Sequence, residues 1–173
     1  MLSTDLDVME EVLDGYRGPL KIQLCGPWTL AATLELTRTL NVAIADPGAV
    51  ADLTASLAEG AAAHVSELAK RVPGARLVVQ FDEPALAAVA GGEVPTASGM
   101  SRIAPVEADV LRERLAQVIA ATRRYGSGRR PLACGARCSR CSRVRGGHGG
   151  HDAGQQAQAG LRGLGHPVLF PPP

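Results

Sequence analysis

No stretch of this 173-residue chain reaches the roughly 18 consecutive apolar residues that a membrane-spanning helix needs. Residues 1–5 also lack the basic start and the following apolar run of a secretory signal peptide. These two absences predict a cytoplasmic protein with no membrane partner. In that compartment the four cysteines are expected to be thiols and not disulfides.

Lysine and acidic residues are almost missing from the last part of the chain. Residues 123–173 hold nine arginines, no lysine and a single acid, Asp152, so their formal charge is +8. Residues 1–122 hold 9 Lys and Arg against 16 Asp and Glu, a formal charge of −7. We therefore expect an ordered part, residues 1–124, and a disordered Arg- and Gly-rich tail, residues 125–173, which has too few large apolar side chains to offset the entropy of ordering.

Hydrophobic periodicity divides the ordered part into helices and strands. Apolar residues alternate with polar ones in residues 20–25, and residues 76–81 form a second, largely buried strand pattern. Helical periodicity covers four segments: residues 3–16, 28–38, 47–72 and 105–122. Asp46 and Pro47 are the expected N-cap and first residue of the third of these helices. Strands that alternate with helices predict an α/β fold with a parallel sheet and right-handed crossovers.

Both predicted strands run into residues of chemical interest. The first continues into Gly26-Pro27-Trp28-Thr29, and the second continues into Asp82-Glu83-Pro84-Ala85-Leu86. In a parallel α/β barrel the active site lies at the carboxyl ends of the strands, where an acid can bind a substrate amine. The alternative is that Asp82 and Glu83 form an N-cap pair for a helix that begins at Pro84. Residue chemistry alone leaves the two interpretations open.

A known family carries both motifs. The segment Gln80-Phe-Asp-Glu-Pro-Ala-Leu86, about 55 residues after a strand that ends in Gly-Pro-x-Thr, resembles the C-terminal catalytic barrel of cobalamin-independent methionine synthase. The short actinobacterial-type relatives are the most similar, and the resemblance covers roughly residues 3–122. It implies a partial TIM-type (β/α) barrel fragment, whose family transfers a methyl group from methyltetrahydrofolate to homocysteine on a zinc ion. The resemblance also implies that Asp82 contacts the homocysteine amine, with Glu83 as a weaker second candidate.

The zinc-binding half of the family pattern is missing. The family's first zinc ligands are a His-x-Cys pair, which would fall near residues 122–134, but Cys134 has Leu132 two positions before it. The folate-facing Trp of the family corresponds to Thr33. We therefore expect no catalytic residues, no metal and no cofactor in this chain, and we interpret it as an inactive, truncated fragment. The simplest hypothesis for the tail is a frame-shifted reading of a GC-rich gene after about residue 124.

The tail also supports a non-enzymatic interpretation. Cys134, Cys138 and Cys141 have the spacing of the iron–sulfur triplet in radical-adenosylmethionine enzymes, and together with His148 and His151 they could bind zinc. No predicted element holds these ligands, so accidental spacing is favoured, ahead of adventitious zinc. The arginines could bind nucleic acid by charge, but the tail lacks interleaved aromatic residues, and a solvated tail is favoured. An interaction module remains the alternative to an enzyme fragment.

Three further side chains are expected to be structural. Cys25, at a strand end, is interpreted as a small buried residue, although it could line the mouth of a pocket. Trp28 is expected in the core. His64 lies on the apolar stripe of the long helix, and a packed, hydrogen-bonded imidazole is favoured there over a ligand.

Overall fold

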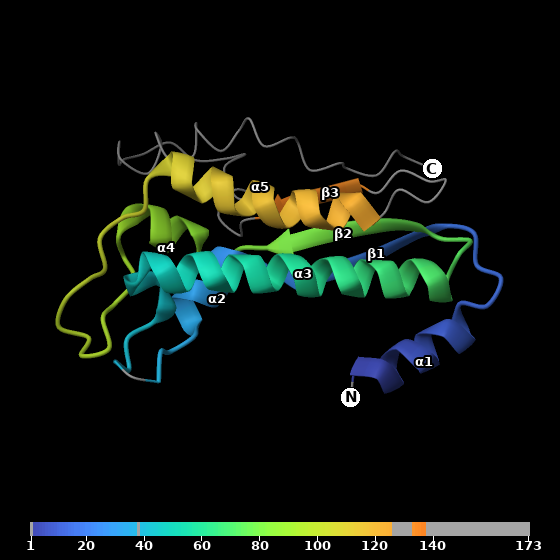
Figure 1. Ribbon diagram of the computed structural model, residues 1–173, viewed down its shortest axis with the longest axis horizontal. Helices are drawn as coiled ribbons and strands as arrows, with labels where there is room; N and C mark the ends of the chain where they lie inside the picture. Colours follow the sequence, from blue (N-terminus) through green and yellow to red (C-terminus); the bar gives the residue numbers. More distant parts are fainter. Residues whose placement is uncertain (1, 38, 126–132, 138–173) are drawn as a thin grey trace, which may run out of the picture.

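The computed structural model describes residues 2–37, 39–125 and 133–137 (Figure 1). Within them the order of elements is α1 (Leu2–Val12), β1 (Pro19–Cys25), α2 (Pro27–Thr33), the 3-10 helix η1 (Ala43–Ala45), α3 (Pro47–Arg71), β2 (Arg76–Asp82), α4 (Leu86–Gly91), α5 (Ala108–Tyr125) and β3 (Ala133–Arg137). This order confirms the predicted α/β class. No helix in these ranges combines the length and the apolar character needed to cross a bilayer.

The strands form one parallel sheet in the order β1-β2-β3. β1 pairs with β2 along its whole length, from Pro19 opposite Arg76 to Cys25 opposite Asp82. β3 continues the sheet on the other side of β2, and its last residue, Arg137, is also opposite Asp82. Parallel neighbours need long crossover connections, and α3 and α5 lie within those connections. The carboxyl ends of all three strands therefore meet at one edge of the sheet.

β3 corrects one expectation. Sequence periodicity predicted no strand after residue 124, yet Ala133–Arg137 pairs with β2. The segment is short and built from Ala, Cys and Gly before its final Arg, so it carries no apolar alternation by which a strand is recognised. Its pairing depends on the edge that β2 offers. The rest of the predicted tail, residues 126–132 and 138–173, lies outside the described residues.

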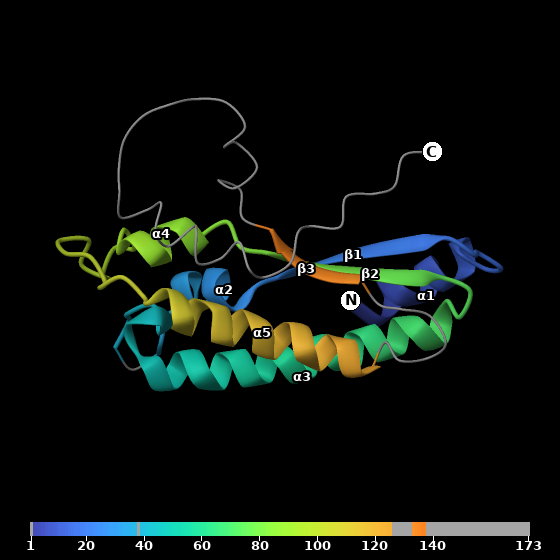
Figure 2. The ribbon, with the colours of Figure 1, turned by 90° about the horizontal axis from the view of Figure 1, so that it is seen from above.

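The two faces of the sheet differ because side chains alternate along a strand. Leu77, Val79 and Phe81 of β2 are buried in a core shared with α3 and α5, which lie side by side along this face (Figure 2). We call the opposite face the polar face. It carries three exposed residues of β1 and three half-buried residues of β2, namely Lys21, Gln23, Cys25, Val78, Gln80 and Asp82.

Helix boundaries agree with the sequence where the signal is local. The Asp46 carboxylate accepts the backbone N–H groups of Gly48 at 2.8 Å and Ala49 at 3.3 Å, so α3 begins as predicted. α2 ends at Thr33 and not at residue 38, because the following chain turns back into a bridge between Glu35 and Val42.

The predicted helix over residues 105–122 also begins later than expected, at Ala108. The chain before it is held extended against the region of α4. The N–H of Ile103 donates to the carbonyl of Val94 at 2.8 Å, and the N–H of Val106 donates to the carbonyl of Val89 at 3.3 Å. Helix α4 was expected only in the alternative interpretation, with a start at Pro84, and it begins at Leu86; six residues are too few to establish a helical period.

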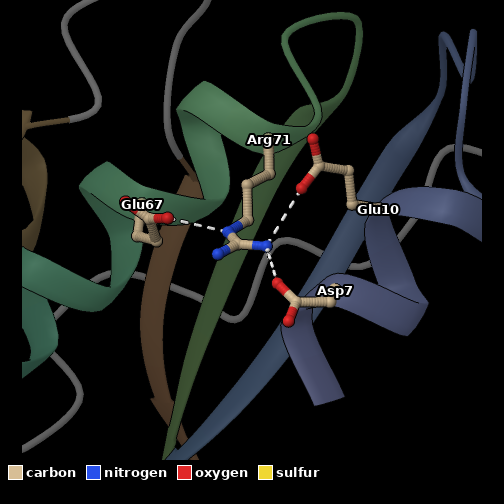
Figure 3. Close-up of polar contacts among 4 residues, drawn as sticks. All are labelled: Asp7, Glu10, Glu67 and Arg71. Carbon is tan, nitrogen blue, oxygen red and sulfur yellow. Dashed lines mark hydrogen bonds and ion pairs between the residues drawn. The ribbon is translucent and has the colours of Figure 1, made fainter. Parts of the chain in front are cut away.

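Arg71, in the last turn of α3, joins α1 to the rest of the molecule (Figure 3). Its Nε donates to Glu67 at 2.7 Å, and its Nη1 contacts Asp7 at 2.5 Å and Glu10 at 3.0 Å on α1. The hydrogen bond to Asp7 has the largest effect on the pKa of the guanidinium, and with the bond to Glu67 it raises that pKa further above its ordinary range. Apolar residues of the first helical segment, Leu6, Met9 and Leu13, pack against the same core.

Replacement of Arg71 by Ala is expected to loosen α1 selectively. The carboxylates of Asp7 and Glu10 lose their shared cation, so the amides of α1 should exchange with solvent several-fold faster while those of β2 keep their protection. Hydrogen exchange with residue resolution measures this. Arg112→Ala is the control, because Arg112 pairs with Asp109 within α5. Unchanged exchange in α1 would show that its apolar contacts alone hold it.

Candidate functional site

The two sequence motifs meet at the carboxyl edge of the sheet. The N–H of Gly26 donates to the carbonyl of Asp82 at 2.9 Å, and the Cα atoms of Cys25 and Asp82 are partners in the β1–β2 ladder. The turn that leaves β1 therefore lies beside the turn that leaves β2. Two segments about 55 residues apart in the sequence form one structural unit.

Glu83 is the centre of that unit. Its side chain is fully buried and accepts three hydrogen bonds from the first turn of α2. Oε1 accepts the N–H of Trp28 at 3.0 Å, and Oε2 accepts the N–H and the hydroxyl of Thr29, each at 2.7 Å. The first N–H groups of a helix have no partner within the helix, so a carboxylate from a neighbouring strand satisfies them. We call this arrangement the Glu83 cap.

The alternative interpretation, that Asp82 and Glu83 cap the helix after Pro84, was wrong. Glu83 does cap a helix, but the helix is α2, which precedes it in the chain, and not the helix that follows Pro84. The N-cap residue of α4 is Ala85, which makes no side-chain capping bond. The reason is geometric: β2 delivers Glu83 beside the start of α2, where the N-cap residue, Gly26, has no side chain of its own to offer.

Gly26 and Thr29 make the Glu83 cap possible. A Cβ atom on Gly26 would lie 2.3 Å from Cδ of Glu83, far inside van der Waals contact, so only glycine leaves room for the carboxylate. The Thr29 hydroxyl donates to Glu83 and accepts the N–H of Ala85 at 3.3 Å. The Gly-Pro-x-Thr and Asp-Glu-Pro-Ala motifs are thus complementary parts of one hydrogen-bond network.

Trp28 confirms its predicted place in the core. Its side chain is 1% exposed, and Nε1 donates to the carbonyl of Leu111 in α5 at 3.1 Å. The indole therefore joins α2 to α5, while its backbone N–H joins α2 to Glu83. This residue is the only tryptophan in the chain, so its fluorescence reports on the surroundings of the Glu83 cap.

Asp82 has a different environment from Glu83, although the two are adjacent. It is the last residue of β2 and lies half-buried on the polar face. Its Oδ2 accepts the side-chain amide of Gln23 at 3.1 Å, and its Oδ1 accepts the side-chain amide of Gln80. The two acids therefore lie in different environments. Glu83 is buried and caps α2, whereas Asp82 lies at the surface, where a carboxylate can bind a cation.

Burial and charge shift two pKa values at this edge. Burial raises the pKa of Glu83, and the hydrogen bonds from Thr29 and Trp28 oppose that rise without cancelling it. The pKa of the Cys25 thiol is raised by its partial burial and then by the negative charges of Glu83 and Asp82. A raised pKa leaves less of the thiolate, the nucleophilic form, at neutral pH.

The expectation that Cys25 is buried was wrong. The residue is exposed, because the alternation of β1 places it on the polar face with Gln23, whereas Leu24 faces the core. His64 is half-buried in α3, and burial lowers its pKa, as expected of a packed imidazole. Thr33, the position that corresponds to the folate-facing Trp, is exposed and its hydroxyl donates to carbonyls of its own helix.

The described residues bring no three His, Cys, Asp or Glu side chains together in a way that could hold a metal ion. Of the residues proposed from sequence as zinc or iron–sulfur ligands, Cys134 lies in β3. The others, Cys138, Cys141, His148 and His151, lie outside the described residues. The cysteine-triplet hypothesis therefore stays a prediction.

Sequence reasoning missed the residues that partner the two acids. Thr29 is part of the Gly-Pro-x-Thr motif, and Gln23 is one of the polar positions in residues 20–25. Neither pattern indicates the acid that the residue contacts. One signal was available: a helix that begins at Gly26-Pro27 has no side-chain cap of its own, which indicates an acceptor from elsewhere in the chain. No family of proteins, curated protein or solved structure matches the chain in the comparisons that were made.

Replacement of Glu83 by Gln is expected to change how stability depends on pH. The pKa of Glu83 is higher in the folded state than the value of 4.5 that applies to the unfolded chain. The contribution of this group to the free energy of unfolding is therefore complete below pH 4.5, and it is lost as the pH rises through the folded-state pKa. The amide that replaces the carboxyl group cannot titrate. The free energy of unfolding of the parent, minus that of Glu83→Gln, should therefore be largest in acid and fall toward neutral pH.

Urea titrations followed by Trp28 fluorescence between about pH 4 and pH 8 measure this difference. Glu59→Gln is the control, because Glu59 is an exposed carboxylate on α3 remote from the cap. A difference for Glu83→Gln that is independent of pH, or that grows toward neutral pH, contradicts the assignment.

Two glycine substitutions test the space beside Glu83. Gly26→Ala should lower stability by about 1 to 3 kcal/mol, because the new methyl group collides with the buried carboxylate. Gly60→Ala, within α3 and with open space at its Cβ position, should raise stability by about 0.5 to 1 kcal/mol. Denaturant midpoints of both variants provide the measurement. Equal effects of the two substitutions would rule out the close approach of Gly26 to Glu83.

Proposed function

We propose that this chain is a fragment of a cobalamin-independent methionine-synthase-like barrel, which keeps the contact for the homocysteine amine at Asp82 and does not itself transfer a methyl group. The observation that carries the proposal is the position of Asp82. Its carboxylate lies at the carboxyl edge of a parallel sheet, beside the Gly-Pro-x-Thr turn that the family resemblance pairs with it.

The arrangement of the sheet supports the barrel part of the proposal. Strands that follow one another in the chain are neighbours in the sheet, all are parallel, and α3 and α5 lie on the same face (Figure 2). A (β/α) barrel requires this pattern, whereas a doubly wound sheet carries helices on both faces. In a closed barrel the polar face would line the interior, with Asp82 at the end where active sites lie.

Energetics limit what Asp82 can do alone. A charge-assisted hydrogen bond from an ammonium to a carboxylate contributes about 1.5 to 3 kcal/mol. A dissociation constant of about 1 mM needs about 4.1 kcal/mol, so this contact by itself supports millimolar affinity at best. In the family a zinc–thiolate bond adds most of the remaining affinity and supplies the nucleophile. The sequence has Leu132 where the first zinc-binding histidine would stand, so we propose no methyl transfer from methyltetrahydrofolate.

A second candidate function rests on the charge of residues 123–173. A formal charge of +8 on an Arg-rich segment suits a non-enzymatic module that binds nucleic acid through its phosphates, or zinc through its cysteines. Affinity for the phosphates of nucleic acid falls steeply with salt, whereas recognition of an amine by Asp82 depends on one carboxylate. The two candidates are therefore separable by variant and by ionic strength.

Titration calorimetry with L-homocysteine tests the proposed function. The expected result is no binding at micromolar concentration, with or without zinc, and no methionine formed from methyltetrahydrofolate. Any millimolar binding should disappear in Asp82→Asn and persist in Asp109→Asn, which removes an exposed carboxylate of α5. A micromolar signal that Asp82→Asn abolishes would overturn the proposal of an inactive fragment, because a working pocket would then be present.

A further inference from the structure

Gln23 and Gln80 flank Asp82 on the polar face. The Cα atoms of the two glutamines are partners in the β1–β2 ladder, and those of Cys25 and Asp82 are partners two residues further along. Because side chains alternate along a strand, these four residues share one face at the carboxyl edge of the sheet. The placement brings two amides, from two different strands, to one carboxylate.

Each oxygen of that carboxylate accepts one amide. Gln23 Nε2 donates to Oδ2 at 3.1 Å, and Gln80 Nε2 donates to Oδ1. One donor on each oxygen, from two strands, fixes the plane of the carboxylate as well as its position. A single donor would leave the carboxylate free to rotate about its terminal torsion, which is a soft one.

Both donors are neutral amides, so neither of them is a counter-ion for Asp82. The ion pairs formed by side chains that the structure describes involve Arg71, Arg112 and Arg114, and none of them includes Asp82. At Arg71 the opposite holds, since a guanidinium neutralises the carboxylates around it. A carboxylate held by amides can still pair with a cationic ligand, and its orientation is already set.

We propose that Gln23 and Gln80 are the positioning residues of the Asp82 site, and that they orient its carboxylate toward the ammonium group of the ligand. This inference rests on the proposed function, because it assigns them a role in that same site. It adds a residue from β1, so recognition of the amine depends on the pairing of two strands and not on the Asp-Glu-Pro-Ala-Leu motif alone.

The test is an NMR titration of the full chain with L-homocysteine over the millimolar range, with N-acetylhomocysteine as the ligand that lacks an ammonium. Gln23→Leu and Gln80→Leu keep the size of the side chain but remove the donor. Each should weaken binding of homocysteine by roughly three- to tenfold, the size of one hydrogen bond. Neither should alter the response to N-acetylhomocysteine or the fluorescence of Trp28. Gln117→Leu, on α5, is the matched control and should change nothing.

A further variant addresses Arg137, whose Cα lies opposite Asp82 on β3. Unchanged or tighter binding in Arg137→Gln supports the two glutamines as the groups that fix the orientation of the Asp82 carboxylate. Weaker binding in that variant would assign the role to Arg137 and overturn the inference.

One measurement needs no ligand. In the free protein, Asp82→Asn should shift the side-chain NH2 resonances of both glutamines, and unshifted resonances would overturn the positioning role. The proposed function and the positioning role fail differently. Millimolar homocysteine binding that Asp82→Asn leaves intact refutes the amine contact of the proposed function, and an absence of binding leaves the ligand-free measurement to decide the role of the glutamines. Binding that Asp82→Asn abolishes but both Gln→Leu variants preserve refutes only the role of the glutamines.

Discussion

A buried carboxylate needs hydrogen-bond donors, and the start of a helix has donors that need an acceptor. Glu83 and α2 meet both needs at once, and the arrangement of the carboxyl edge of the sheet depends on it. Without an acceptor the N–H groups of Trp28 and Thr29 would be unpaired beside the core, and without those donors a charged Glu83 could not remain buried. The same contact requires glycine at position 26, because a Cβ atom there would collide with Glu83.

This contact also explains why two adjacent acids differ. Side chains along a strand alternate between its two faces, and this alternation continues to Glu83, the residue after β2. Glu83 is therefore buried, whereas Asp82 lies on the polar face. The inner acid holds the turn after β1 against the turn after β2, and the carbonyl of Asp82 accepts the N–H of Gly26 in the same unit. Any ligand chemistry at Asp82 therefore depends on a structural residue next to it.

Sequence patterns predicted the parts of this architecture that are local. The alternation in β1, the buried run of β2 and the Asp46 cap of α3 are all set by neighbouring residues, and all three predictions were confirmed. The contacts that form the candidate site are not local. Glu83 and Thr29 are 54 residues apart, and no period within either segment indicates the other. Asp82 was predicted at a strand end, but its partner Gln23 follows only from the register of β1 against β2.

β3 lies beside Asp82 in the sheet, at the point where the proposed barrel would continue. If the chain is the barrel fragment that we propose, β3 would occupy the position of the family strand whose end carries the His-x-Cys ligands. Here that strand ends in Gly135-Ala136-Arg137, with Arg137 opposite Asp82. In the sequence none of these three residue types is a usual zinc ligand, and the backbone of Cys134 lies about 10 Å before that end at the usual rise of a strand. The pairing of β3 with β2 therefore extends the sheet, and the proposal of no methyl transfer rests on the sequence at the end of this strand.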